Sequence, residues 1–176
     1  KKSNNTFRIA SYWSAGVRDY YGKKPINKVA DLKGMKIRTQ MSGTAADFWK
    51  QCGAIPTQVA WGELYQALQQ GIVDAAENDY TNFSLLDHHK TKNGKFITET
   101  NHDYTTRLVL MNGKKWAALT ADQKKWIDAA LKKATAEERK VTYGMAEKSK
   151  KKFIAHGAKV NSVDKAQFIA IAVPIQ

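Results

Sequence analysis

The chain has 176 residues, 43% of them hydrophobic, with five Trp, seven Tyr and six Phe; this is enough apolar surface for a core and argues against global disorder. Its 29 Lys and Arg against 16 Asp and Glu give a net charge of +13, which suits nucleic acid, anionic lipid or anionic metabolites equally. The single Cys52 excludes an internal disulfide and a Cys-rich zinc module, and no apolar run reaches the roughly 20 residues that span a bilayer.

The first half of the chain alternates short strand-like and helix-like segments. The patterns predict strands at residues 7–13, 35–40, 55–60 and 72–76, the first closed by a loop at residues 14–16 and the second with Arg38 near its C-terminal end. Helices are predicted at residues 45–52, 62–70 and 80–88, with one helical turn at 29–34 and a start signal at Ser42. This alternation predicts an α/β fold with a parallel sheet and right-handed crossovers.

The second half changes character. A long strand is predicted at residues 104–112, and Thr120 followed three residues later by Gln123 is typical of a helix N-terminus. An interrupted apolar stripe continues for about thirty residues, more than twice the mean helix length. A helix of that length bridges two bodies or is bent.

The usual signatures of catalysis and metal binding are missing from the sequence. The adjacent His88 and His89 would point about 100° apart on a helix, and neither they nor Cys52 have zinc-ligand spacing. No Gly-x-Ser-x-Gly or phosphate-binding loop occurs, and Cys52 falls on an apolar helix face, which favours a core thiol. Asp74 and Glu77 are interpreted as solvated or capping carboxylates. An enzyme, a bound metal and a cofactor are therefore not expected.

The basic charge leaves one alternative function, an interaction module that binds nucleic acid or another polyanion. The lysines are scattered, however, and the densest run lies on a helix that also carries Glu137, Glu138 and Glu147, as a solvated face does. No known nucleic-acid reader motif accompanies them. Nucleic acid is therefore not the expected partner.

Three blocks of sequence resemble the solute-binding proteins of tripartite ATP-independent periplasmic (TRAP) transporters, in their order and spacing as well as in their residues. They are Gly16-Val17-Arg18, the stretch from Lys24 to Arg38, and the stretch from Trp61 to Asn78. Residues 100–102, 108–112 and 116–123 are also similar, so the resemblance covers about residues 7–155.

The resemblance implies a two-lobed periplasmic-binding-protein architecture with a long bridging helix. Residues 16–105 with 146–176 would form the second α/β lobe, and residues 1–15 with 106–145 would form part of the first lobe and the connecting helix. The expected partners are a small carboxylate ligand, the membrane components of a TRAP transporter, and an N-terminal portion of the same protein that would build the rest of the first lobe. The expected location is the periplasm, and the expected mechanism is capture by hinged closure.

The resemblance also implies five ligand-binding residues. Arg38 would hold the ligand carboxylate through two parallel donors, and Asn78 would complete the polar grip. Arg18, Trp61 and His102 match positions near the ligand in some members of the family. The structural alternatives are a strand-end ion pair for Arg38, a helix cap for Asn78, a loop ion pair for Arg18, core packing for Trp61 and a satisfied polar contact for His102.

The chain departs from the family pattern beside these residues. Where the family usually has Asp-Gly-x-Glu-Asn-Pro, residues 74–79 read Asp-Ala-Ala-Glu-Asn-Asp. Without the proline, the helix entrance loses a fixed φ, and Asp79 adds a negative charge next to the expected carboxylate site. Gln40-Met41 also differs from many members, which is expected to change ligand preference.

Overall fold

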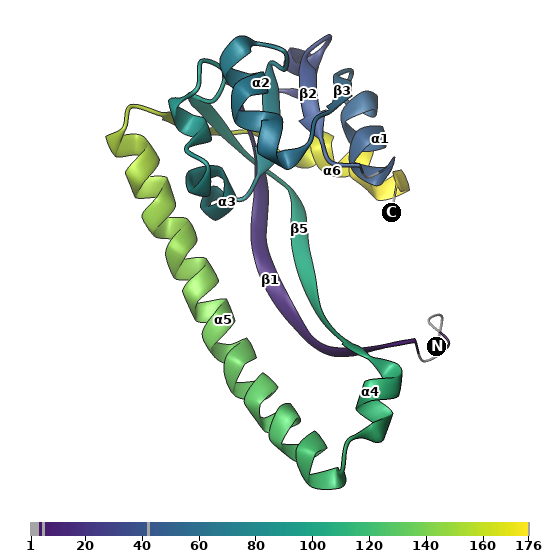
Figure 1. Cartoon of the computed structure of the whole chain (residues 1–176). Coiled ribbons are helices and arrows are strands. Elements are labelled where there is room, and N and C mark those ends of the chain that lie inside the picture. Colours follow the sequence, from purple (N-terminus) through teal and green to yellow (C-terminus); the bar gives the residue numbers. More distant parts are fainter. Residues whose placement is uncertain (1–3, 5, 42, 176) are drawn as a thin grey trace.

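A long two-stranded ribbon and one long helix extend from a body of sheet and short helices (Figure 1). The structure is a computed structural model that describes residues 4, 6–41 and 43–175. The sheet has six strands in the order β3-β2-β4-β1-β5-β6. In chain order the strands are β1 (Phe7–Gly22), β2 (Lys36–Thr39), β3 (Ile55–Gln58), β4 (Ala75–Asn78), β5 (Phe96–Asn112) and β6 (Lys159–Ser162).

The α/β class is confirmed, but the sheet is mixed rather than parallel. Strand β2 is parallel to β3 and β4, and β6 is parallel to β5, as the strand–helix alternation predicts. Strand β1 runs antiparallel to both β4 and β5, so it divides the sheet. The long pairing of β1 with β5 forms the ribbon in Figure 1.

The four helices expected from the sequence are present, and two further short helices, at residues 113–118 and 166–172, were not predicted. In chain order the helices are α1 (Gly43–Gln51), α2 (Leu64–Gln70), α3 (Tyr80–Leu85), α4 (Gly113–Ala118), α5 (Ala121–Ala155) and α6 (Ala166–Ala172), with 3₁₀ turns at Val29–Leu32, Trp61–Glu63, His88–Lys90 and Val173–Ile175. Ser42, the expected start of α1, lies outside the described residues. The predicted helix at 80–88 is interrupted after α3, where Asp87 takes a left-handed φ of 51°.

Three strand predictions are wrong in their bounds. The strand predicted at 104–112 begins eight residues earlier, as β5 (Phe96–Asn112). Strand β1 does not end in a loop at 14–16 but continues to Gly22, because Gly16 takes a φ of +87° and the register shifts between Ser14 and Val17 as a β-bulge. The strand predicted at 72–76 is Ala75–Asn78, and Ile72 is exposed. The run from Ile72 is apolar, but a turn after α2 occupies its first half.

The buried core lies at one end of the molecule. All members of both buried hydrophobic clusters fall within residues 20–97 and 153–168. No residue of 106–145, a stretch that the structure describes in full, is buried. Large apolar side chains around this stretch are instead 45–69% exposed: Ile9, Tyr12, Leu108, Leu110, Trp126, Val141, Tyr143 and Met145.

Helix α5 begins at the predicted cap and is fastened to the ribbon by polar contacts. Thr120 and Gln123 make both bonds of the capping box. The hydroxyl groups of Ser11 and Thr135 lie 2.6 Å apart, and the backbone N–H of Ser14 donates to Glu138 at 3.2 Å. These bonds join the middle of α5 to β1 beside the bulge.

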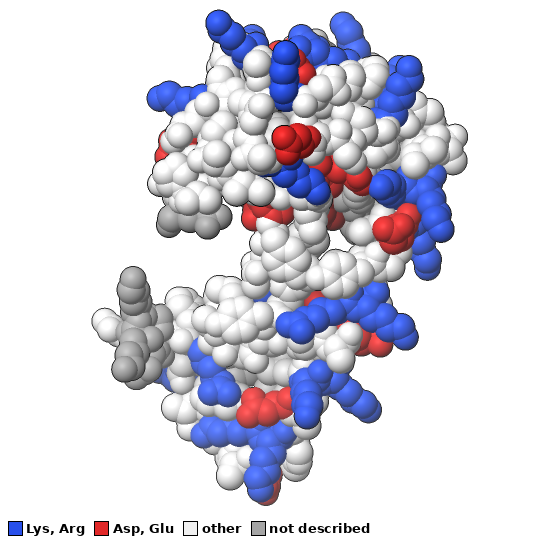
Figure 2. Space-filling view, turned by 180° about the vertical axis from the view of Figure 1, so that it is seen from behind, with Lys and Arg blue, Asp and Glu red and all other residues white. Residues whose placement is uncertain are grey.

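The positive charge is dispersed. On the face shown in Figure 2, Lys and Arg side chains are spread over both ends of the molecule with acidic side chains between them, and the surface is hollowed at the waist. None of the helices in the described part of the chain combines the length and apolar character that crossing a membrane requires.

Candidate ligand-binding site

A pocket of about 580 Å³ opens beyond the C-terminal ends of the parallel strands β2 and β4. Ligands of open α/β sheets bind beyond these strand ends. The lining residues come from strands β1 to β5, from the segments that follow β2 and β3, and from α3: Arg18, Arg38, Gln40, Met41, Gln58, Val59, Ala60, Trp61, Asn78, Asn82 and Arg107. Four of the five predicted ligand residues are among them.

Arg38 is a buried cation whose hydrogen bonds are incomplete. The side chain lies in β2, the residue is 3% exposed, and Nε donates to the carbonyl oxygen of Val59 at 3.0 Å. Nη1 is buried without a hydrogen-bond partner, and no described carboxylate forms an ion pair with this guanidinium. Burial and the positive charge of Arg18 lower the pKa of Arg38, although Tyr21 and Glu77 act against this shift. The predicted alternative of a strand-end ion pair is therefore wrong within the described residues.

Asn78, at the end of β4, is oriented by the residue that replaces the family proline. The backbone N–H of Asp79 donates to Oδ1 of Asn78 at 3.0 Å, a bond that a proline cannot make. This leaves the Asn78 amide group as a donor at the pocket. Asn78 is not a helix cap, because Asp79 caps α3.

The charge of Asp79 is directed into α3 and not toward the pocket. Oδ1 accepts from the backbone N–H groups of Thr81 and Asn82, at 2.9 and 3.1 Å, and Oδ2 accepts from the Asn82 side chain. Asp79 does not line the pocket. The expected negative charge at the carboxylate site is therefore taken up by the helix N-terminus.

Trp61 forms part of the pocket wall and is only partly buried. The Arg38 guanidinium carbon lies 5.6 Å from the centre of its ring, and the His88 ring packs edge-on behind it at 5.2 Å. His88 is fully buried, and burial followed by the charge of Arg38 lowers its pKa to about 4. A neutral histidine therefore supports the wall.

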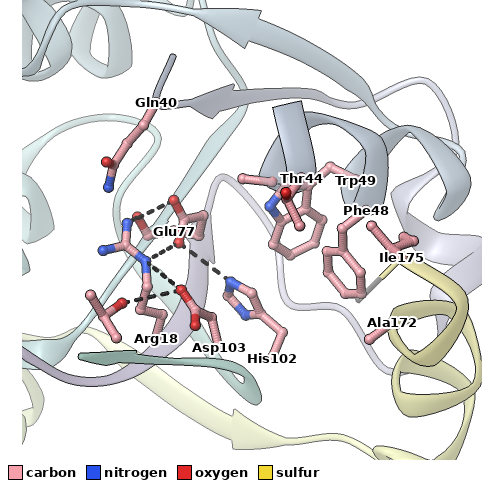
Figure 3. Close-up of a pocket in the computed structure, with 12 residues that line it drawn as sticks. Arg18, Gln40, Thr44, Phe48, Trp49, Glu77, His102, Asp103, Ala172 and Ile175 are labelled. Atoms are coloured by element: carbon pink, nitrogen blue, oxygen red, sulfur yellow. Dashed lines mark hydrogen bonds and ion pairs between the residues drawn. The ribbon is translucent and has the colours of Figure 1, made fainter. Parts of the chain in front are cut away.

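Arg18, Glu77 and His102 form a connected buried group next to this pocket (Figure 3). Arg18 donates through Nε and Nη2 to both carboxylate oxygens of Glu77, with Nη2–Oε1 at 2.7 Å. His102 Nε2 lies 3.3 Å from Glu77 Oε2, and its Nδ1 lies 2.8 Å from the Thr100 hydroxyl. A carboxylate only accepts, so the Nε2–H group of His102 is the donor to Glu77.

The charges of this group stabilise one another. Burial acts to raise the pKa of Glu77, but hydrogen bonds from His102 and Arg18 lower it overall. Burial acts to lower the pKa of Arg18, but the hydrogen bond and charge of Glu77 raise it. Glu77 is 3% exposed, so the interpretation of this residue as a solvated or capping carboxylate is wrong. The carboxylate of Asp74 accepts a hydrogen bond from the backbone N–H of Lys36, at the start of β2, and forms an ion pair with Lys23.

His102 lines a second pocket, of about 360 Å³, which shares only Arg18 and Gln40 with the first. In Figure 3 its ring faces Glu77 on one side and lies near Phe48 and Trp49 on the other. The ring centres of His102 and Phe48 are 5.7 Å apart and nearly parallel. The structure thus brings together Arg38, Asn78, Arg18 and Trp61, and places His102 in the neighbouring pocket.

Sequence reasoning missed Arg107, Gln58 and Asn82 at the first pocket. Arg107 lies in β5 opposite Trp13, nearly seventy positions from Arg38 along the chain, and no local pattern marks it. Asn82 follows the N-cap of α3, and only the turn of that helix directs it to the pocket. No local signal could have selected these residues.

Neither a reactive thiol nor a cluster of metal ligands is found in the described residues. Cys52 is buried in a core cluster, as predicted, and burial raises its pKa to about 12. Three or more metal-ligating side chains do not converge anywhere in the described residues.

Comparison with known proteins places these features in a family. Residues 1–175 match the sequence model described as bacterial extracellular solute-binding protein, family 7. The C4-dicarboxylate-binding periplasmic protein DctP of Vibrio cholerae is 30% identical over 156 residues, which are 89% of this chain and 46% of that protein.

Solved structures of TRAP periplasmic solute binding proteins share the fold. A TRAP periplasmic solute binding protein from Sulfitobacter sp. NAS-14.1, with bound β-D-galacturonate, has a TM-score of 0.90 and 29% identity, covering 97% of this chain and 56% of its own. A second TRAP periplasmic solute binding protein, from Chromohalobacter salexigens and with bound D-glucuronate, has a TM-score of 0.92 and 26% identity. The match covers 99% of this chain and 58% of that protein. The periplasmic-binding-protein architecture is confirmed, and the chain spans about half the length of these relatives.

Proposed function

The chain belongs to family 7 of the bacterial extracellular solute-binding proteins, the family of the TRAP receptors, and we propose that it binds a small organic acid through the Arg38 guanidinium. In this proposal the protein works in the periplasm and delivers the acid to the membrane components of a TRAP transporter. It makes and breaks no covalent bond.

The observation that carries the proposal is the unsatisfied Nη1 of Arg38. A buried donor without an acceptor costs free energy, more so when it is charged. A ligand carboxylate would supply the acceptor and the countercharge together, and a charge-assisted bond of this kind contributes about 1.5–3 kcal/mol. No acidic side chain lines the pocket in the described chain, so nothing internal competes for that place.

The neighbours of Arg38 support the same ligand class. Asn78 offers its amide donor, held in orientation by Asp79. Trp61 offers a flat apolar wall against which the carbon skeleton of the acid can pack. The relatives with bound glucuronate and galacturonate carry a carboxylate on such a skeleton.

We propose that capture occurs by closure of two lobes, residues 16–105 with 146–176 and residues 1–15 with 106–145. The core clusters lie in the first set, and the ribbon and α5 connect it to the second (Figure 1). The bulge at Gly16 and its contact with α5 offer a place where the ribbon can bend. The acid would shift the equilibrium toward the closed state by binding it more tightly.

The exposed apolar side chains of the second set support a further polypeptide partner. An apolar face of this extent is normally covered. We propose that it packs against the portion of the family fold that this chain does not include, either from the same protein or as a separate chain. Co-expression of such a portion should raise the free energy of unfolding and protect Trp126 from quenching by iodide.

Calorimetric titration with uronic acids and C4-dicarboxylates tests the ligand proposal. We expect saturable binding of an acid to the intact chain, lost in Arg38→Ala and weakened at least tenfold in Arg38→Lys, which keeps the charge but not the paired donors. Arg139→Ala is the control, because Arg139 is exposed on α5 and lines neither pocket. Near-ultraviolet circular dichroism confirms that each variant is folded.

Two results would contradict the proposal. One is binding of the acid that survives Arg38→Ala in the folded variant. The other is binding of a short DNA duplex that weakens steeply with salt and does not depend on Arg38, which would favour a nucleic-acid module.

A further inference from the structure

The pocket has more positive charge than one carboxylate can neutralise. Three arginines line it, and Glu77 meets the charge of Arg18 from within the protein. Neither Arg38 nor Arg107 has an ion-pair partner in the described part of the chain. Two positive charges therefore remain at the pocket.

Arg107 reaches the pocket from a different direction than the other lining residues. The other lining residues all fall within residues 18–82 of the sequence, in the body that holds the core. Arg107 lies in the ribbon strand β5, where it pairs with Trp13 of β1. Arg107 is exposed, so its side chain can reorient toward a ligand at low cost. Arg38 and Arg107 therefore line the same pocket from two different parts of the fold.

The groups available to the ligand between these two arginines are carboxamides. Asn82 donates its side-chain N–H to Asp79, which leaves Oδ1 as an acceptor, and Asn78 offers an N–H donor. Gln40 and Gln58 add two more amides to the lining. Such groups pair with hydroxyl groups, which both donate and accept.

We propose that the ligand is a hydroxylated dicarboxylic acid, such as an aldaric acid, with one carboxylate bound by Arg38 and the other bound by Arg107. This inference rests on the proposed function. Arg107 is then the residue that selects a diacid over the corresponding monoacid. The amides between the arginines bind the hydroxyl groups of the carbon chain.

Galactarate and galactonate form a matched pair of probes, because both are open six-carbon chains with the same configuration and they differ in whether the second end is a carboxylate or a CH₂OH group. Each is titrated calorimetrically, at low ionic strength, into the intact chain and into Arg107→Gln, Arg139→Gln and Arg38→Ala. Arg107→Gln removes the charge and keeps a polar side chain of similar length. Arg139→Gln removes an exposed arginine far from the pocket lining.

We expect the intact chain and Arg139→Gln to bind galactarate at least about tenfold more tightly than galactonate, because the diacid makes one more charge-assisted contact. In Arg107→Gln this ratio should fall toward one. At higher salt the diacid should lose affinity more steeply than the monoacid.

The inference is overturned if galactonate binds as tightly as galactarate, or if the ratio persists in Arg107→Gln, while both acids still require Arg38; the proposed function then stands. If neither acid binds, or if binding survives Arg38→Ala, the proposed function fails and takes this inference with it.

Discussion

The backbone N–H of Asp79 donates to Oδ1 of Asn78, while the carboxylate of Asp79 caps the helix that follows. Asp79 thus orients the side-chain amide of Asn78 at the pocket and also caps the N-terminus of α3. A proline at this position has neither a backbone N–H nor a carboxylate, so the chain orients Asn78 by a bond that the usual family pattern does not contain.

Replacing Asp79 by Ala should therefore destabilise the protein. The two capping bonds to Thr81 and Asn82 are lost, at a cost of about 1 kcal/mol. Asp79→Asn is the control, since asparagine also caps helices well and should cost less. Urea unfolding measures both, and equal stability of Asp79→Ala and the unmodified protein would show that the cap contributes nothing.

Removing Arg18 should destabilise the fold more strongly than any cap. Arg18→Ala leaves the Glu77 charge buried with only His102 as a donor, which costs about 3–5 kcal/mol. The double variant Arg18→Leu with Glu77→Leu removes both charges and should recover part of that loss. A double variant as unstable as the sum of the two single changes would mean that the pair is not coupled.

The buried His88 should make stability depend on pH. Its folded pKa of about 4 lies below the usual 6.5, so the unfolded chain takes up its proton first as the pH falls. The contribution of this group is complete above pH 6.5 and decreases between pH 6.5 and 4, by about 3 kcal/mol in total.

The comparison with His88→Gln isolates this effect. Asp19 titrates in the opposite direction, because burial raises its pKa to about 6 and its protonation below that pH adds stability. The difference between the unfolding free energies of the protein and His88→Gln should therefore shrink as the pH falls from 7 to 4. A difference that is constant with pH would contradict a neutral, buried His88.

Gly16→Ala should destabilise the bulge of β1 for two reasons. A φ of +87° costs an L-residue about 1–2 kcal/mol, and the added methyl would lie 3.0 Å from Cβ of Asp79. Gly34→Ala is the matched control, because its φ of +73° carries the backbone cost and nothing lies within 4 Å of the new methyl. Thermal unfolding should show the larger decrease for Gly16→Ala, and equal decreases would remove the contact from the explanation.

Local patterns were sufficient to predict several elements and the position of Arg38 near the end of its strand. The capping box at Thr120, the apolar face of α1 and the strand with Arg38 near its end depend on neighbours within a few positions, and all are present. Departures in the motif around Asn78 were also visible. The effect of these departures on Asn78 could not be predicted from the sequence, because it depends on the direction of the Asp79 carboxylate.

Which residues share a pocket depends on contacts between distant parts of the chain. Strand pairing between residues far apart set the length of β1 and β5, carried Arg107 to the pocket of Arg38, and buried Glu77 between Arg18 and His102. Local periodicity records which face of an element is apolar, but the burial and charge of a side chain depend on elements that the chain brings together only when it folds.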